Sequence, residues 1–392
     1  MRIEIAGLAR TRPEVIRREL WHRAGRPVDL ARLGDDRDYL LDLGLFAQVL
    51  HRVRRDPATD RPVLVLTVAE RPTFLALPTV DWDPENRFSY GVLASEDNLH
   101  GRGEALRLQG RIGGIRELSL GYGRRWTFDR RLGFSSSAYW IREKKTTEEI
   151  RETRRGLSCV LSPRRGRGSG IALNPGWERA ESEPLQEADS ARGRESDDHR
   201  WLGATVFDDT RHYRIRATHG RYVGLGLTRH GGPLGGDTDF WRGSVDLLGV
   251  VPTGGESGLT IATRLLWSEG TVPRYLRLNL GGTSTLRGYA HGEFGGDSRW
   301  IGWVEQVVPL LPRRTLRFER IGRTIDLTVD GAAFVDVGTV WDDDELQRGE
   351  AAVQVGGGLG LRILLPFVQV LRLELSTDGE EVRVDGAGGI RL

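Results

Sequence analysis

Residues 281–295 read GGTSTLRGYAHGEFG and lie between segments in which apolar and polar residues alternate. Alternation over short segments is typical of β-strands, which then have one apolar and one polar face. In a membrane β-barrel the polar face lines a watery lumen and the apolar face meets lipid. We therefore expect this stretch, called here the RGY loop, to fold back into a lumen, where Arg287 needs an acidic partner.

Alternating segments occur on both sides of the RGY loop, for example at 105–109, 213–218, 276–280 and 371–375. A soluble β-sandwich would also alternate. Arginines recur on the polar face together with Glu374, however, and this favours a wide lumen. The chain after residue 72 has room for roughly 16 strands of about 10 residues plus turns.

Composition narrows the classes of protein further. The 57 basic residues nearly cancel the 55 acidic ones, so no general attraction to nucleic acid is implied despite a pI near 8.8. The single cysteine, Cys159, excludes an internal disulfide and a multi-cysteine metal site. No run approaches the roughly 18 apolar residues of a membrane helix, which excludes a helical membrane protein. A mean hydropathy of -0.39 still suits a barrel, because the lumen is polar.

The first residues begin directly with a strand pattern, without an apolar core and cleavage site of a secretory leader. Three explanations stay open: a leader already removed, a misplaced start codon, or a cytosolic chain.

Residues 1–72 predict a small α+β module. A short strand ends at Gly7, and Thr11 is the expected cap of a first helix. Asp29 is the expected cap of a second helix, which ends at Gly44. Two strands follow, FAQVLHRV at 46–53 and VLVLTVAE at 63–70.

This order of strand, helix, helix, strand, strand resembles the POTRA domain, the periplasmic module of outer-membrane assembly proteins. The resemblance rests on the threonine before the first helix, on LGLF before the second strand, and on the closing residues Val68, Glu70, Arg71 and Pro72. It implies docking of extended clients by strand addition at an exposed edge. A generic α+β mini-domain is the alternative.

Four spaced motifs after residue 72 are similar to those of the BamA/TamA-type outer-membrane assembly family (POTRA domain plus transmembrane β-barrel, bacterial surface antigen superfamily). The first, in SEDNLHGRGEALRL, is a barrel-start motif made by Asn98, Gly101, Gly103 and Glu104. The second, TVFDDTRHY, resembles the family's D-T-R segment, although Ala217, Thr218, His219 and Gly220 replace the proline-x-x-glycine that follows in the family.

The third motif is Leu286, Arg287, Gly288 and Tyr289, which corresponds to the tip of the family's long sixth loop. The fourth is Glu305 with Asp336 and Gly338, which match the acidic positions on neighbouring strands that receive the loop's arginine. A guanidinium held by two carboxylates on adjacent strands makes short, directional contacts that fix a whole loop. We expect Gly288 to permit a sharp turn, and Tyr289 to pack in the lumen with its hydroxyl in water.

The alternative for these residues is an ordinary exposed arginine, with Glu305 and Asp336 paired elsewhere.

Other kinds of site find little support. The chain lacks G-x-S-x-G, H-E-x-x-H and P-loop motifs, and VGGGLGLRI at 355–363 has the wrong glycine spacing for a dinucleotide site. We therefore expect no enzyme, no catalytic residue, no metal and no cofactor. The basic residues along the first helix, Arg10, Arg12, Arg17, Arg18 and Arg23, are interpreted as a solvated face. The charged stretches within 142–200 are interpreted as extracellular loops or strand extensions, or as solvated linker.

The resemblance implies a membrane all-β protein, with one α+β POTRA-like domain at 1–72 in the periplasm and an antiparallel transmembrane β-barrel of about 16 strands at 73–392. Its partners would be outer-membrane lipid, unfolded outer-membrane protein clients, and periplasmic or inner-membrane accessory proteins, with no nucleic acid. Its function would be insertion or translocation of other outer-membrane proteins through a weak seam between the first and last strands.

Two hypotheses compete with this function: a dedicated secretion channel or passive pore, and a barrel that anchors a separate effector. Two departures from the family pattern are also apparent. The chain has room for one POTRA domain where BamA and TamA carry several, and its last residues, VRVDGAGGIRL, lack a terminal aromatic residue.

Overall fold

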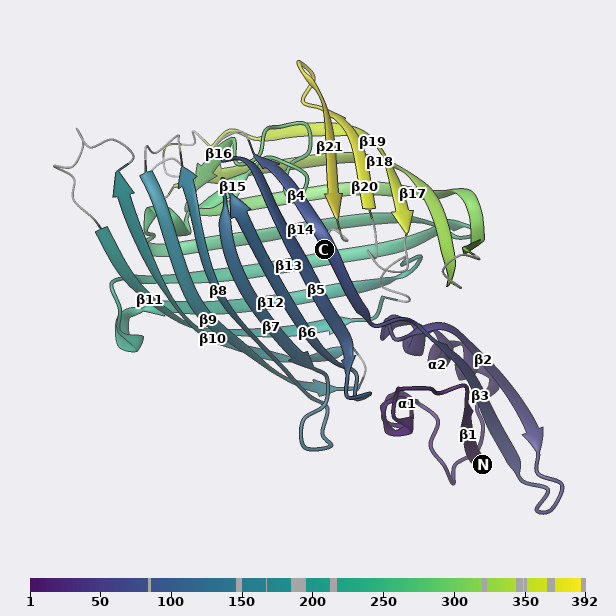
Figure 1. The fold of residues 1–392 in the computed structure, drawn as a ribbon. Helices are drawn as coiled ribbons and strands as arrows, with labels where there is room; N and C mark the ends of the chain where they lie inside the picture. Colours follow the sequence, from purple (N-terminus) through teal and green to yellow (C-terminus); the bar gives the residue numbers. More distant parts are fainter. Residues whose placement is uncertain are drawn as a thin grey trace. The chain divides into compact units, whose positions relative to one another are not determined.

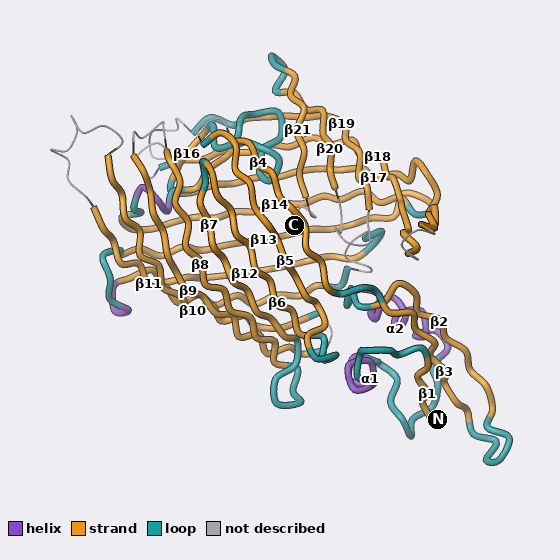
Figure 2. The backbone as a smooth tube through the Cα atoms, in the orientation of Figure 1, coloured by secondary structure: helices purple, strands orange, loops and turns teal. Residues whose placement is uncertain are grey.

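The structure is a computed structural model that describes residues 1–83, 86–145, 150–166, 168–184, 195–211, 217–318, 323–342, 348, 351–364 and 371–388. Strands make up most of the described chain, and the helices α1 and α2 lie within its first 45 residues (Figure 2). No helix in these ranges has the length and apolarity needed to cross a membrane.

The N-terminal part follows the predicted order of elements: β1 (Arg2–Ala6), α1 (Pro13–Glu19), the 3-10 turn η1 (Leu30–Arg32), α2 (Leu33–Asp42), β2 (Phe46–Arg55) and β3 (Pro62–Glu70). The three strands form one sheet in the order β1-β3-β2, in which β1 runs parallel and β2 antiparallel to β3. Its core consists of fully buried apolar side chains: Ile16, Leu20, Leu40, Phe46 and Leu64.

The two predicted helix caps have different outcomes. Asp29 caps η1, where its carboxylate accepts a hydrogen bond from the Ala31 N–H. The prediction for Thr11 is wrong, because Arg12 occupies the cap position of α1 without a side-chain bond. Thr11 is instead buried, with its N–H donating to Glu70 and its hydroxyl accepting from Asn98.

A second sheet contains sixteen strands, the number expected from the length of the chain (Figure 1). In chain order they are β4 (Phe74–Asp83), β5 (Arg87–Leu99), β6 (Glu104–Gly113), β7 (Arg116–Arg124), β8 (Leu132–Lys145), β9 (Ile150–Arg165), β10 (Ser169–Pro184), β11 (Glu195–Asp209), β12 (Gly220–Gly231), β13 (Asp239–Gly254), β14 (Ser257–Thr271), β17 (Ser298–Phe318), β18 (Arg323–Trp341), β19 (Gln354–Leu364), β20 (Leu371–Thr377) and β21 (Val382–Gly388). They lie in the order β21-β20-β19-β18-β17-β14 and then β13 down to β4. The registers established between neighbours are antiparallel, for instance from β17 through β21.

The two faces of this sheet are inverted relative to those of a soluble protein. In β20, Arg372, Glu374 and Ser376 are at most 5% exposed, whereas Leu373 and Leu375 are 44% and 49% exposed. Because neighbours along a strand point to opposite faces, the charges share the covered face and the leucines share the open one. A polar inner and an apolar outer face are typical of a sheet that lies in lipid.

Parts of the charged stretches within 142–200 continue the strands. β8 runs to Lys145, β9 begins at Ile150, and β10 runs to Pro184. Residues 146–149 and 185–194, which hold the rest of the interpreted loops, lie outside the described residues.

The chain divides into two compact units. The first comprises Met1–Arg167, Ala172–Leu202 and Pro233–Asp237, and the second comprises Gly168–Ile171, Gly203–Gly232 and Thr238–Leu392. The barrel-start motif belongs to the first unit together with the N-terminal sheet. The RGY loop belongs to the second, together with β17 to β21, so each of the two sites is complete within one unit.

Candidate functional site: the seat of the RGY loop

The RGY loop is a compact excursion between β14 and β17. The strands β15 (Leu278–Leu280) and β16 (Phe294–Gly296) pair antiparallel at its base. Inside it, the Thr285 hydroxyl accepts from the Gly281 N–H at 3.0 Å, and the Gly282 N–H donates to the Tyr289 carbonyl at 3.2 Å. These bonds within the loop present residues 286–289 as a defined tip.

Leu286 fixes the apolar side of this tip. Its side chain is fully buried, as is that of Leu280 at the loop's base. Both belong to one apolar cluster with Leu248, Val250, Ala262, Tyr289, Ile301 and Trp303. Burying a leucine stabilises by roughly 1.5–3 kcal/mol, so this contact alone holds the tip close to β13, β14 and β17.

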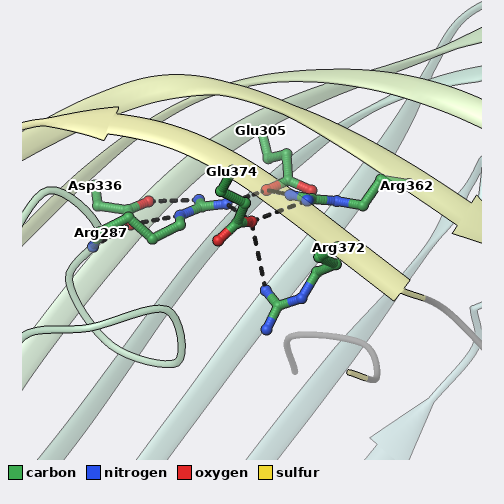
Figure 3. Close-up of polar contacts among 6 residues, drawn as sticks. All are labelled: Arg287, Glu305, Asp336, Arg362, Arg372 and Glu374. Carbon is green, nitrogen blue, oxygen red and sulfur yellow. Dashed lines mark hydrogen bonds and ion pairs between the residues drawn. The ribbon is translucent and has the colours of Figure 1, made fainter. Parts of the chain in front are cut away.

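Arg287 is the largest fully buried side chain of the described residues, and Asp336 of β18 is its main partner (Figure 3). The Arg287 Nε donates to Asp336 Oδ2 at 2.8 Å, and Nη2 donates to Oδ1 at 2.6 Å. The Arg287 backbone N–H also donates to Oδ2, at 3.1 Å. A single carboxylate therefore fixes both the side chain and the main chain of the loop tip.

Two further carboxylates surround the same guanidinium. Its Nη1 donates to Glu305 Oε2 of β17 at 2.6 Å and to Glu374 Oε1 of β20 at 3.3 Å. One face of the guanidinium lies 3.4 Å from the ring centre of Phe334. A cation over an aromatic face gains further stabilisation when water is excluded, as it is here.

Two more arginines complete a network of three cations and three anions. Arg362 of β19 donates to Glu305 at 2.9 Å and lies 2.9 Å from Glu374, while Arg372 of β20 lies 3.7 Å from Glu374. Five of the six side chains are at most 7% exposed, and Glu305 is 15% exposed. Buried charges are costly unless they are paired, and this arrangement compensates each charge with an opposite one.

Glycines supply the space for the tip. Gly288 has a φ of 101°, and a Cβ at this position would lie 2.6 Å from the Thr377 carbonyl oxygen. A Cβ on Gly356 of β19 would lie 1.9 Å from the Arg287 carbonyl oxygen. The glycine-rich segment 355–363, which does not fit a nucleotide site, thus provides the backbone surface against which the loop tip lies.

Tyr289 differs from its expected environment in one respect. Its ring packs edge-on against Phe294, with centroids 5.4 Å apart. Its hydroxyl lies 3.2 Å from the Val355 carbonyl oxygen and 3.3 Å from Gln354 Oε1, so it has protein partners where water was expected.

The structure therefore brings Arg287, Glu305 and Asp336 together. Sequence reasoning missed Arg362, Arg372 and Glu374 as members of the site. Arg372 and Glu374 stand out in the sequence as charges on the polar face of a strand, but the register that places them beside the loop is a tertiary feature. Gly338, the remaining residue of the fourth motif, lies in β18, where a Cβ would be 3.0 Å from Leu280.

The barrel-start motif forms the turn between β5 and β6 in the first unit. The Asn98 amide donates to the Thr11 hydroxyl at 2.9 Å and accepts from the Gly103 N–H at 2.8 Å. Gly101 has a φ of 71°, and a Cβ there would lie 2.2 Å from the Arg10 carbonyl oxygen. The motif thus makes direct contact with the segment that leads into α1, while Glu104 begins β6 opposite Arg124 of β7.

The interpretation of the first-helix arginines as a solvated face is confirmed for Arg10, Arg12, Arg17 and Arg23, which are exposed, whereas Arg18 is half-buried. Three of the five also make polar contacts with residues 96–102. Arg10 forms an ion pair with Glu96 at 2.8 Å. Arg12 donates to the His100 carbonyl at 3.2 Å, and Arg18 donates to the Arg102 carbonyl at 2.9 Å. Carbonyl groups in tight turns lack strand partners, which makes them acceptors for these side chains.

The D-T-R segment forms a local contact. Arg211 donates to both carboxylate oxygens of Asp209, at 2.9 and 3.0 Å, and both side chains are less than 10% exposed. Residues 212–216, which continue this motif, lie outside the described residues. Within the described ranges, no three His, Cys, Asp or Glu side chains are grouped so that they could hold a metal ion.

A sixteen-stranded antiparallel sheet with one polar and one apolar face is typical of outer-membrane β-barrel proteins. A family model described as the Omp85 superfamily domain matches residues 98–386. The chain therefore belongs to the Omp85 superfamily, in which BamA and CdiB are outer-membrane insertion or secretion proteins.

Solved structures share this fold at low sequence identity. BamA from Haemophilus ducreyi lacking POTRA domains 1-3 is 16% identical, with a TM-score of 0.59 over 99% of this chain and 84% of that chain. CdiB from Acinetobacter baumannii is also 16% identical, with a TM-score of 0.59 over 100% and 70%. CdiB from Escherichia coli is 12% identical, with a TM-score of 0.62 over 99% and 73%. No curated protein matches the sequence.

Proposed function

We propose that this protein assists the insertion or translocation of other outer-membrane proteins, and that the RGY loop stabilises the barrel wall during this work. The sixteen-stranded sheet closes into a transmembrane barrel, with Arg287, Gly288 and Tyr289 inside the lumen. The observation that carries the proposal is the Arg287 network, because a passive pore has no need of a loop whose buried arginine is held by three carboxylates.

The proposed mechanism depends on neighbouring strands being held together more strongly on one side of the barrel than at the seam. The arginine network joins β17, β18, β19 and β20 through side chains as well as through their backbone ladders. A seam between the first and last strands would lack such side-chain support. Unpaired backbone groups next to lipid are costly, so a client hairpin gains by pairing with them. Insertion of a client by this mechanism needs no nucleotide, metal or other cofactor.

In this proposal residues 1–72 act as a POTRA-like domain in the periplasm. β1 and β2 are both edge strands of the three-stranded sheet, and an extended client or a periplasmic or inner-membrane accessory protein would add to one of them. The contacts of Asn98, Arg12 and Arg18 support a fixed connection between this domain and the β5–β6 turn. Lipid surrounds the barrel, and nucleic acid has no part in the function.

Reconstitution into liposomes tests the proposal directly. The full chain is inserted into vesicles, an unfolded outer-membrane barrel is added, and its folding is followed by protease protection. We expect faster folding than in empty vesicles, and a loss of that acceleration in Arg287→Ala. Arg299→Ala is a matched control, because Arg299 donates to the Asn279 carbonyl at the loop's base.

A dedicated secretion channel is the second candidate, and the superfamily's inclusion of secretion proteins favours it. It predicts transport of one partner without acceleration of a general client. Ion conductance with neither activity would identify a passive pore and would contradict the proposal.

A further inference from the structure

The RGY loop also contacts the last hairpin of the described chain. Arg383 of β21 donates from Nε to the Gly288 carbonyl oxygen at 3.1 Å. β20 and β21 are paired from Leu371 opposite Gly388 to Thr377 opposite Val382. Thr377 is the last residue of β20 before the turn between the two strands. The loop tip thus touches this hairpin through a side chain as well as through its backbone.

The fit at this contact is close. A Cβ on Gly288 would lie 2.6 Å from the Thr377 carbonyl oxygen and 3.0 Å from the Asp378 nitrogen. A Cβ on Gly356 would lie 1.9 Å from the Arg287 carbonyl oxygen and 3.4 Å from the Thr377 carbonyl oxygen. The backbones of the loop, of β19 and of the β20 end therefore meet at van der Waals distance, with no space for a side chain between them.

Charge joins the same elements a second time. Glu374 of β20 accepts from Arg287 at 3.3 Å and lies 2.9 Å from Arg362 of β19. Arg383 also forms an ion pair with Glu381 at 2.7 Å, and Glu381 is exposed.

We propose that Arg383 is a positioning residue that couples the RGY loop to the β20–β21 hairpin, so that release of the loop loosens the last strand and an open hairpin releases the loop. The functional role of this coupling rests on the proposed function, because β21 is the strand at the proposed seam. The coupling itself is a property of the folded chain and needs no client.

Amide hydrogen exchange of the full chain in detergent micelles tests the proposal. In Arg383→Ala we expect exchange to accelerate about tenfold both at 382–388 and at the loop tip 286–290, since one lost hydrogen bond of ordinary strength changes a local opening equilibrium by about that factor. Arg287→Ala should accelerate exchange in the same two segments. If the two sites are coupled, the double variant accelerates exchange by less than the product of the single effects.

Two control variants separate the coupling from general loosening. Glu381→Gln removes the exposed ion pair of Arg383 but leaves its bond to Gly288, so the loop tip should keep its exchange rate. Arg299→Ala removes a bond to the loop from β17 and should leave 382–388 unchanged. Acceleration confined to β21 in Arg383→Ala, or multiplicative effects in the double variant, would overturn the proposal. Neither outcome would bear on client folding, which is measured separately.

Discussion

The RGY loop and the N-terminal module are both fastened to strands of the large sheet, but by different chemistry. The loop is held by a buried network of three arginines and three carboxylates. The module is held by separate contacts of several kinds: hydrogen bonds from Arg12 and Arg18 to main-chain carbonyls, the Asn98–Thr11 bond and the exposed Arg10–Glu96 ion pair. A buried ion network is lost as a unit when one charge is removed, whereas separate hydrogen bonds are lost one at a time.

The RGY loop and the N-terminal module should therefore differ in how much stability a single substitution removes. The loop should respond to single substitutions with large effects, because each leaves an uncompensated charge. The module should respond with small and nearly additive effects. The following predictions test this contrast, in order of decreasing effect.

The largest effect is expected for Arg287→Ala. It leaves Asp336 and its neighbours with excess negative charge, which for a buried pair costs about 3–5 kcal/mol of unfolding free energy. Equilibrium unfolding in urea with lipid vesicles measures it. Arg277→Ala is the matched control at the loop's base, where the ion pair with Asp342 is over one third exposed, and about 1 kcal/mol or less is expected. Equal losses of unfolding free energy in the two variants would contradict the expected difference between the buried network and the exposed ion pair.

Gly356→Ala tests the contact between the RGY loop tip and β19 without changing a charge. The added methyl group would lie 1.9 Å from the Arg287 carbonyl oxygen, so the loop tip must move. We expect a loss of about 1–3 kcal/mol, as for other overpacked sites, together with faster proteolysis of the loop. Gly110→Ala serves as the control, since a Cβ there meets no atom within 4 Å. A neutral Gly356→Ala would mean that the tip does not rest on β19.

Asn98→Ala tests the module's attachment. It removes the buried bond to Thr11 and the half-buried bond from the Gly103 N–H. We expect about 1–2 kcal/mol, with the change confined to the first unit. Limited proteolysis between the module and β4 gives the readout. Thr11→Val removes only the bond between Thr11 and Asn98 and should have about half the effect of Asn98→Ala. A larger loss of stability in Asn98→Ala than in Arg287→Ala would contradict the expected order of the two effects.

The smallest effect is a pH dependence of the module. Burial raises the pKa of Glu70, but the Thr11, Arg10 and Ala9 N–H groups donate to its carboxylate and lower the pKa by more, so it lies below its ordinary value of 4.5. The resulting stabilisation is fully present above the unfolded pKa, and it is lost as the pH falls through the folded pKa. Amide protection at 9–11, taken as the exchange rate relative to the intrinsic rate at each pH, should therefore fall on acidification from pH 6 to pH 3, and this fall should shrink in Glu70→Gln.

The same contrast explains how much of the molecule the sequence predicts. Strand alternation and total length predict the sixteen strands, and apolar spacing with Gly and Asp signals predicts the order of elements in residues 1–70. The resemblance of the motif residues to those of the family predicts the meeting of Arg287 with Glu305 and Asp336.

The other contacts leave little trace in the sequence. Arg362 and Glu374 join the site only through the register of β18, β19 and β20, which no local pattern specifies. The module's attachment uses main-chain carbonyls, which every residue possesses, so Arg12 and Arg18 look like any exposed arginine. Thr11 matches a helix-cap pattern, but the carboxylate of Glu70 and the amide of Asn98 compete for its polar groups.

The Asp336 carboxylate of β18 holds the Arg287 guanidinium, and the other contacts of the RGY loop depend on this pair. A double-mutant cycle with Arg287→Ala, Asp336→Ala and the double variant, measured by equilibrium unfolding in lipid vesicles, tests this pairing most directly. We predict a coupling energy of about 2–3 kcal/mol, since the pair is bidentate and fully buried. A coupling energy within about 0.5 kcal/mol of zero would place the two side chains apart and contradict this account.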